Sequence, residues 1–490
     1  MSRRVTLALL AWAFLAWDLE RACADTLPKL PESAPGLVSL GAPVTAMPAS
    51  GVQLQLEQEA QDKQDKSYQV GKQVDFRAYW KNGPWLETAD KAFRFHVGGL
   101  LHADAGWWKA EDQVMNGPGG VGPLNDGADF RRARLHLLGQ MYESVVWTLE
   151  VGFENRLPQF FNAYAEFPNL PYVGAFRLGH FREPFGMDAL CSYNNLTFVE
   201  RGLVQDPFVP FFNLGMMLYG DLFDQRATYA TGIFRSNSDS FNAADFGDGN
   251  YAYTSRLTFN PWYVEENGNA LHFGAAFSYR VLPQLNAQGQ PVTSGGVRRV
   301  TFFSRPEERV NTPTFISTPV LQADHENLLG TELGLSLGSF LLQAEYMAAF
   351  VDQALAPGQK TPASLFFHGF YVQASYFLTG ESRPYSRSDA FFGTVRPREN
   401  FFLVRGGEDR RGPILFGRGA WEVALRYSQV NLNSRDIEGG MLRDLTIGLN
   451  WYLNPNCRFL WNYLLIWRDA AGHTSDGLAQ AFDARFQIEF

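Results

Sequence analysis

The chain has 490 residues, a formal net charge of −9 and 15% aromatic residues, of which 41 are phenylalanines. Its acidic balance argues against nucleic acid as a partner, because nucleic-acid-binding domains are typically basic. A mean hydropathy of −0.20 does not exclude a membrane-spanning β-barrel, in which only alternate residues of each strand meet lipid.

The amino terminus has the pattern of an export signal. Arginines at positions 3 and 4 precede an apolar run over residues 5–17, and an Ala-Cys-Ala triplet at 22–24 supplies the small residues of a cleavage site. The run is too short for a membrane anchor, which needs about 20 apolar residues. We therefore predict a signal peptide over residues 1–24.

Residues 25–70 are predicted to form a separate periplasmic segment. Residues 27–50 are rich in proline, alanine and glycine, which is typical of a linker. Residues 52–66 are polar, and either a short helix or a disordered segment fits their composition. The remainder of the chain, residues 71–490, is predicted to be one domain.

Sixteen segments of this domain alternate between apolar and polar residues with a period of two. Their number is even, and their lengths suit the roughly 9–11 residues of a tilted strand that crosses a membrane. Sixteen such strands, closed into a barrel, enclose an aqueous channel. The segments lie near residues 93–104, 129–141, 145–153, 160–167, 175–181, 214–219, 226–234, 250–259, 270–280, 330–337, 340–350, 367–378, 420–430, 443–453, 456–466 and 481–490.

The last segment has the pattern of a strand that closes a barrel. Phe482, Ala484, Phe486, Ile488 and Phe490 share one face, and the chain ends on the final phenylalanine. The exported part contains no apolar stretch of about 18 residues, so it can be integral to a membrane only as a closed barrel. We predict an all-β fold, a 16-stranded antiparallel transmembrane β-barrel in the bacterial outer membrane.

Short and long connections between the segments mostly alternate, which is typical of barrels with periplasmic turns and long outer loops. Residues 282–329 form one long outer link. Another, residues 182–213, carries many apolar side chains. We predict that this second link folds into the barrel as a constriction loop, and a surface lid is the alternative. Residues 379–419 form a long link on the side of the short turns, where a functional or mobile segment is expected.

Arginine is frequent on the polar face of the predicted strands. A guanidinium in the lumen costs little, whereas one facing lipid at mid-depth would cost about 2–4 kcal/mol. The arginines could line an anion path, or they could pair with lumen carboxylates, and their spacing leaves both open. The strand candidates are Arg132, Arg134, Arg177, Arg256, Arg280 and Arg426, and the link at 182–213 adds Arg182 and Arg201.

The sequence contains no enzyme or cofactor motif that survives inspection. His96, His102 and Asp104 share a face and could in principle bind a metal, but positions on a polar wall are the favoured interpretation. We predict no catalytic residue, no metal and no cofactor. Cys191 and Cys457 remain after export, and a disulfide between them does not follow from the sequence.

Six stretches spread over residues 71–490 resemble a known family. They are DGADFRRARL (126–135), FREPFG (181–186), LTFVERG (196–202), YVQASYFLTGESRPY (371–385), GAWEVALRYS (419–428) and GLNWYLNPN (448–456). In these stretches the chain resembles the phosphate-selective porins, the porins O and P and their relatives. The resemblance implies a trimeric anion channel with a basic lumen, a constriction loop and a periplasmic-side link that enters the pore.

The resemblance also adds residues to the candidate site. It implies that Arg131 belongs to the family's basic strand together with Arg132 and Arg134, and that Ser192 is one of the small hydroxyl residues after the Phe-Gly turn. Arg182 stands where a lysine is common in the family. Two family positions differ here, because Gly99-Leu100 replaces a common Gly-Arg and Phe212 replaces a common arginine.

The sequence therefore predicts an outer-membrane porin for small anions, with phosphate or polyphosphate as the expected solutes. A homotrimer embedded in outer-membrane lipid is the expected assembly. A general, weakly selective porin for small polar solutes is the alternative. A barrel that acts as a receptor or an outer-membrane enzyme is disfavoured.

Overall fold

The computed structural model describes residues 75–81, 83–154, 158–236, 250–266, 268–285, 296–405 and 414–490. The predicted signal peptide (1–24) and periplasmic segment (25–70) lie outside the described residues. Sixteen long strands form a closed wall, and each coincides with one of the predicted segments. They are β3 (Phe93–Ala110), β4 (Gly127–Met141), β5 (Val145–Gly152), β6 (Gln159–Leu170), β7 (Gly174–Arg182), β8 (Phe212–Leu222), β9 (Ala227–Arg235), β10 (Tyr251–Val264), β11 (Asn269–Val281), β17 (His325–Leu337), β18 (Phe340–Ala354), β19 (Ala363–Phe377), β24 (Ala420–Ser434), β25 (Ile437–Asn454), β26 (Cys457–Asp469) and β27 (Gly477–Glu489).

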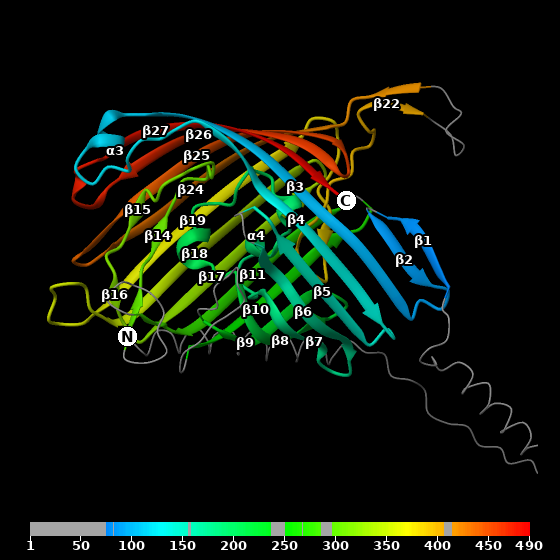
Figure 1. The fold of residues 1–490 in the computed structure, drawn as a ribbon, viewed down its shortest axis with the longest axis horizontal. Helices are drawn as coiled ribbons and strands as arrows, with labels where there is room; N and C mark the ends of the chain where they lie inside the picture. The colour runs from blue at the N-terminus through cyan, green and yellow to red at the C-terminus, as the bar shows by residue number, and fades with distance from the viewer. Residues whose placement is uncertain are drawn as a thin grey trace, which may run out of the picture. The chain divides into compact units, whose positions relative to one another are not determined.

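The barrel closes where its last strand meets its first. Each wall strand pairs antiparallel with the next, and β27 pairs antiparallel with β3, with Arg485 opposite Asp104 (Figure 1). Beyond β27, the backbone of Phe490 exchanges two hydrogen bonds with Gly99, at 2.8 and 3.0 Å. The wall is therefore an antiparallel sheet with no free edge strand, as the aromatic last strand predicts.

The two faces of the wall are the reverse of those of a soluble protein. In β10, Thr254 and Arg256 are buried on the inner face, whereas Leu257 and Phe259 are each 48% exposed on the outer face. The same alternation runs through the neighbouring strands, so the barrel carries an apolar outer belt and a polar, filled lumen. A large exposed apolar belt of this kind is the surface that lipid covers.

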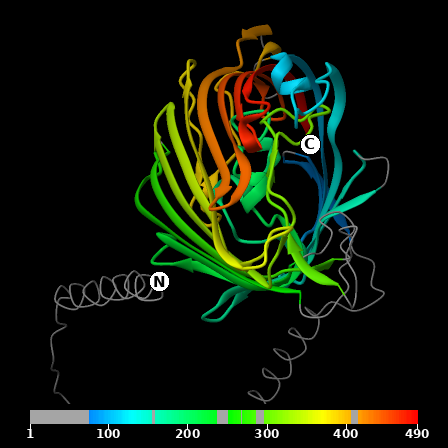
Figure 2. The ribbon, with the colours of Figure 1, turned by 90° about the vertical axis from the view of Figure 1, so that its left-hand side faces the viewer.

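Parts of three connections run inside the wall, because residues in those parts hydrogen-bond to the polar faces of strands. The first joins β7 to β8 and contains α4 (Met187–Leu190), η1 (Tyr193–Asn195) and α5 (Gln205–Phe208); it is called the 183–211 loop below (Figure 2). The second joins β11 to β17, and the third joins β19 to β24. Their short elements are β12 (Gln284–Leu285), β13 (Val297–Val300), β14 (Phe303–Ser304), β15 (Ile316–Ser317), β16 (Leu321–Gln322), β20 (Tyr385–Ser386), β21 (Phe391–Phe392), β22 (Phe402–Arg405) and β23 (Ile414–Gly417).

A short hairpin precedes the wall and was not predicted from the sequence. It consists of β1 (Phe76–Trp80) and β2 (Pro84–Thr88), and β2 pairs with residues 94–96 of β3. The hairpin thus covers the part of β3 that β27 does not reach. The other helical turns are α3 (Asp112–Asn116) and η2 (Ala471–His473), and within the described ranges no helix is long and apolar enough to cross a membrane.

Candidate functional site

The 183–211 loop is tied at its start to one side of the barrel. Glu183 accepts hydrogen bonds from Arg280 Nη1 of β11 at 2.8 and 2.9 Å, and from Thr254 Oγ1 of β10 at 2.5 Å. Further along, Glu345 of β18 accepts the backbone N–H of Met187 at 2.5 Å. Burial of these carboxylates is tolerated because each is hydrogen-bonded to donors from the loop or the wall.

The middle of the loop is held by the opposite side of the barrel. Its backbone carbonyls at residues 196–199 accept hydrogen bonds from wall side chains. The donors are Asn450 of β25 at 2.7 Å, Arg458 of β26 at 2.8 Å and Arg485 of β27 at 2.5 Å. A loop has no ladder partners for its carbonyls, so these lumen donors satisfy groups that would otherwise be buried without a hydrogen bond.

Glu200 is the strongest anchor between loop and wall. Its carboxylate accepts from Arg131 Nε at 3.1 Å and from Arg132 Nη2 and Arg485 Nη2, each at 2.9 Å. Burial opposes ionisation of Glu200, but the three guanidinium groups outweigh it and hold the pKa of the carboxyl well below its ordinary value. One loop carboxylate thus bridges β4 and β27, which lie on either side of β3.

Two arginines shape the turn that follows α4. Arg182 Nη1 donates to the backbone carbonyls of residues 189, 190 and 191 at 2.9, 3.1 and 2.8 Å. Arg201 donates to the carbonyls of Asp188 at 2.8 Å and Cys191 at 2.7 Å. Within the described residues no carboxylate lies at ion-pair distance from Arg182, so carbonyl dipoles hold its charge without cancelling it.

Arginines of β4, of the end of β7 and of the loop surround Tyr193. The guanidinium carbons of Arg132, Arg201, Arg182 and Arg134 lie 4.1, 4.2, 4.7 and 4.8 Å from the centre of its ring. The electron-rich face of an aromatic ring attracts cations at these distances. Four positively charged side chains therefore surround one aromatic ring.

Two cavities lie on either side of this tyrosine. The outer cavity, of about 360 Å³, reaches the first residues of β6 and β8 at the end of the barrel with the long loops. The inner cavity, of about 590 Å³, reaches Leu138 of β4 and Gly220 of β8 near the short turns. Tyr193 is the one described residue that lines both cavities, so its ring lies between them.

Both cavities are lined by more arginines than carboxylates. Arg131, Arg132, Arg134, Arg201, Arg305 and Arg309 line the outer cavity with Glu154, Glu200 and Asp206. Arg177, Arg182 and Arg256 line the inner cavity with Glu150 and Asp389. Among the lining side chains, positive charges outnumber negative ones in both cavities, although the chain as a whole is acidic.

The second inward connection contributes to the outer cavity. Arg305 and Arg309 pair with Asp206 of the 183–211 loop at 3.2 and 2.8 Å. Next to them, Glu307 accepts hydrogen bonds from three wall side chains, Arg426, Ser428 and Thr446. This connection is therefore locked both to the wall and to the first loop.

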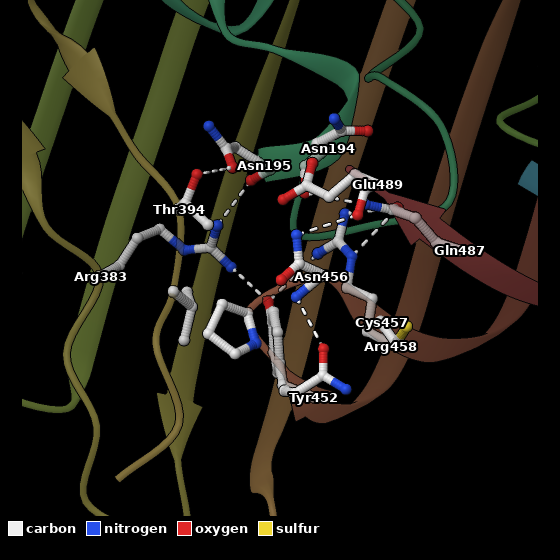
Figure 3. Close-up of a pocket in the computed structure, with 13 residues that line it drawn as sticks. Asn194, Asn195, Arg383, Thr394, Tyr452, Asn456, Cys457, Arg458, Gln487 and Glu489 are labelled. Carbon is white, nitrogen blue, oxygen red and sulfur yellow. Dashed lines mark hydrogen bonds between the residues drawn. The ribbon is translucent and has the colours of Figure 1, made fainter. Parts of the chain in front are cut away.

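The third inward connection supports the loop from the periplasmic side. Arg383 donates to Glu422 at 3.0 and 3.1 Å and to the carbonyl of Asn195 at 2.6 Å. Figure 3 shows Arg383 and Arg458 on either side of Tyr452, whose hydroxyl accepts from both. The pocket drawn there has a volume of about 10 Å³, which suits one water molecule and excludes it as an ion path.

The structure divides the ten predicted site residues into three groups. Four line the outer cavity and four the inner cavity. The remaining two are buried in ion pairs that anchor inward segments, Arg280 with Glu183 and Arg426 with Glu307, and neither lines a cavity. The outer group is Arg131, Arg132, Arg134 and Arg201, and the inner group is Arg177, Arg182, Ser192 and Arg256.

Carboxylate pairing, the alternative left open by the sequence, is extensive. Arg134 pairs with Glu150 at 3.1 Å and Glu154 at 2.8 Å. Most of the other predicted arginines also have a carboxylate partner, namely Arg131 and Arg132 (Glu200), Arg177 (Glu166) and Arg256 (Glu332). Cys191 and Cys457 are free thiols.

Four residues of this site were not predicted from the sequence. Tyr193 carries no motif, and its role depends on which arginines surround it. Arg305 and Arg309 lie in a connection without strand periodicity, so no pattern places them in the lumen. Arg485, in contrast, occupies a polar-face position of the last strand, where alternation alone could have identified it.

Comparison with known proteins decides the family. Residues 102–490 match the model of the phosphate-selective porin O and P family. The chain belongs to this family. Porin O of Pseudomonas aeruginosa is 26% identical over 444 residues, covering 84% of this chain and 91% of the relative. An uncharacterised protein of Caulobacter vibrioides is 26% identical over 423 residues, covering 84% of this chain and 76% of the relative.

Two solved porin structures match most of the chain, with TM-scores below 0.5. The outer-membrane channel DcaP of Acinetobacter baumannii has a TM-score of 0.47 and 10% identity, covering 82% of this chain and 99% of the other. The anion-selective porin from Comamonas acidovorans has a TM-score of 0.46 and 9% identity, covering 81% of this chain and 100% of the other. Family membership and the closed barrel make this protein an integral porin of the outer membrane.

Proposed function

We propose that this porin lets small anions, including phosphate and polyphosphate, diffuse passively through an arginine-lined lumen. The observation that carries the proposal is the excess of arginine over carboxylate along both cavities. A positive lining raises the local concentration of anions and lowers that of cations. Membership in a family described as phosphate-selective supports phosphate as one of the solutes.

Arg182 is the residue on which the proposed selectivity depends most. Its charge lies beside Tyr193, between the two cavities, and backbone carbonyls rather than a carboxylate hold it. A paired arginine presents little net charge to a passing ion, whereas Arg182 keeps its full charge. Conduction also requires weak binding, and a single uncancelled cation attracts an anion without trapping it.

A weakly selective pore for small polar solutes is the second candidate. The pairing of Arg134 with two glutamates, and of most other lumen arginines with one, favours it. Uptake of neutral sugars by liposomes that contain the porin separates the two candidates. Fast uptake at a rate set only by solute size supports the weakly selective pore. As a family member, the porin is also proposed to be a homotrimer.

The proposal is tested by the zero-current potential of single channels of Arg182→Gln in a salt gradient. We expect the anion-to-cation permeability ratio to fall about fivefold, because a unit charge at about 4 Å in water is worth about 1 kcal/mol. Arg443→Gln is the matched control, since Arg443 lies on the outward side of β25 and pairs with Asp469 at 2.7 Å. An unchanged ratio in Arg182→Gln contradicts the proposal.

A further inference from the structure

Tyr193 is placed where a change of its own charge would act on every passing ion. Its ring stands between the outer and inner cavities and lines both of them. Four guanidinium groups lie within 4.8 Å of the ring centre, and they come from β4, from the end of β7 and from the loop itself. The backbone turn that carries it is fixed by Ser192, whose hydroxyl accepts the N–H of Asn194 at 3.3 Å.

We propose that Tyr193 sets the strength of anion selection. Its side chain is neutral while the hydroxyl keeps its proton, and it places a negative charge between the two cavities when the hydroxyl loses the proton. The inference rests on the proposed anion selectivity and names the residue that regulates it. Loss of the phenolic proton to water leaves a phenolate that cancels one of the four surrounding positive charges. Anion preference should therefore decrease as the pH rises.

The electrostatics of the site place this change near neutral pH. Burial alone would raise the pKa of Tyr193, but Arg182, Arg201, Arg134 and Arg132 outweigh it and lower the pKa to about 7. Below pH 7 the ring is neutral and adds no charge to the site, and above pH 7 the phenolate opposes the surrounding arginines. Tyrosine in water ionises near pH 10, so an ordinary tyrosine in the lumen would not titrate in this range.

Other titratable groups lie near the ring, and their contributions to a pH response must be distinguished from that of Tyr193. They are His102 of β3, His136 of β4, Glu150 of β5, and Asp188 and Glu200 of the loop. Glu200 stays ionised across the neutral range, because its pKa is held well below the ordinary value. Substitution of the tyrosine itself therefore separates its contribution from that of the two histidines.

The experiment measures the zero-current potential of the wild-type trimer in a potassium chloride gradient on both sides of pH 7. We expect the anion-to-cation permeability ratio to fall about fivefold over this range, because one unit charge is added beside the path. Ultraviolet absorbance of phenolate, compared between wild type and Tyr193→Phe, should reveal one tyrosine that ionises near neutral pH. A constant ratio, or no such tyrosine, overturns the inference.

Tyr193→Phe keeps the ring and its contacts with arginine but cannot ionise, so its permeability ratio should not change with pH. Tyr193→Trp serves the same purpose if the phenylalanine variant assembles poorly, since tryptophan binds cations well. Tyr229→Phe is the matched control, because Tyr229 also lines the inner cavity while its hydroxyl donates to the carbonyl of Val173 at 2.8 Å, and it should behave like the wild type. A pH response that persists in both Tyr193 variants overturns the inference.

The proposed function can fail independently of this inference. A wild-type channel that prefers cations below pH 7 contradicts the proposed anion selectivity. A channel that prefers anions equally at every pH contradicts only the role of Tyr193. The absorbance measurement reports the ionisation of Tyr193 whichever ion the pore prefers.

Discussion

Replacement of Glu200 by glutamine should loosen the 183–211 loop and at the same time increase anion selectivity. The carboxylate of Glu200 is 5% exposed and accepts from Arg131, Arg132 and Arg485. Glutamine has nearly the same shape, but it is neutral and brings an NH₂ group towards three guanidinium donors. The substitution therefore removes the charge of the anchor and leaves its space filled.

The magnitude follows from the burial of this cluster. Removal of one partner from a buried ion pair costs about 3–5 kcal/mol, because the remaining charge is left without compensation. Arg132 has no second carboxylate among the described residues, so its charge is left unpaired. Arg485 keeps its ion pair with Asp104 at 2.6 Å, and because only one of these two buried arginines loses its partner, we expect the lower end of that range. About 3 kcal/mol corresponds to a roughly hundredfold larger population of the released loop.

Single-channel recording tests both effects. In Glu200→Gln we expect more frequent current fluctuations as the loop detaches, and an anion-to-cation permeability ratio about fivefold higher, because the outer cavity loses one negative charge. Glu166→Gln is the control for loop anchoring, since Glu166 of β6 pairs with Arg177 of β7 and not with the loop. A quiet channel with unchanged or lower anion preference refutes the reasoning.

The pH dependence of this anchor has a definite sign. Because the folded-state pKa of Glu200 lies well below its ordinary value of 4.5, its contribution to stability is fully present above that value. The contribution is lost only as the pH falls through the folded-state pKa. Wild-type fluctuations should therefore stay rare from neutral to mildly acidic pH, and an onset already near neutral pH would contradict this assignment.

Three further predictions concern assembly and the other inward segments. Phe490→Ser should lower the amount of porin inserted in the outer membrane more than it lowers the unfolding temperature of the inserted fraction, because the partly exposed Phe490 ring completes the aromatic outer face of the last strand; normal insertion in membrane fractions would contradict this. Glu307→Gln should increase current fluctuations, because Arg426 loses its charged partner and only one acceptor oxygen remains for Arg426, Ser428 and Thr446, at a cost of about 3–5 kcal/mol; unchanged recordings would show that the second inward connection does not depend on this anchor. Unheated porin should migrate as a trimer on a detergent gel and boiled porin as a monomer, and identical migration of both samples would argue against the trimer.

The wall could be predicted from the sequence because each strand carries its own alternation. In β10, for example, alternate polar and apolar residues assign each side chain to lumen or lipid without knowledge of the neighbouring strands. The β1–β2 hairpin was not predicted, because each of its strands has only five residues and shows too little alternation. The dipeptide Asn82-Gly83, which is typical of hairpin turns, was its one sequence signal.

The contents of the lumen could not be predicted in the same way. Arg426 and Glu307 are 119 positions apart, and no local pattern indicates that they pair. The basic strand Arg132–Arg134 was found from alternation, but its partners Glu200 and Glu154 lie in connections between strands. Whether an arginine is free or paired depends on these long-range contacts, so the sequence left the selectivity of the pore open.

The central claim is that the lumen selects anions, and the zero-current potential of the wild-type channel tests it most directly. The measurement uses a gradient of potassium chloride and then of potassium phosphate across a bilayer that contains single channels, below pH 7. The excess of arginine over carboxylate along both cavities predicts a potential of the sign set by the anion in both salts. A potential of the sign set by potassium in either salt would contradict the account.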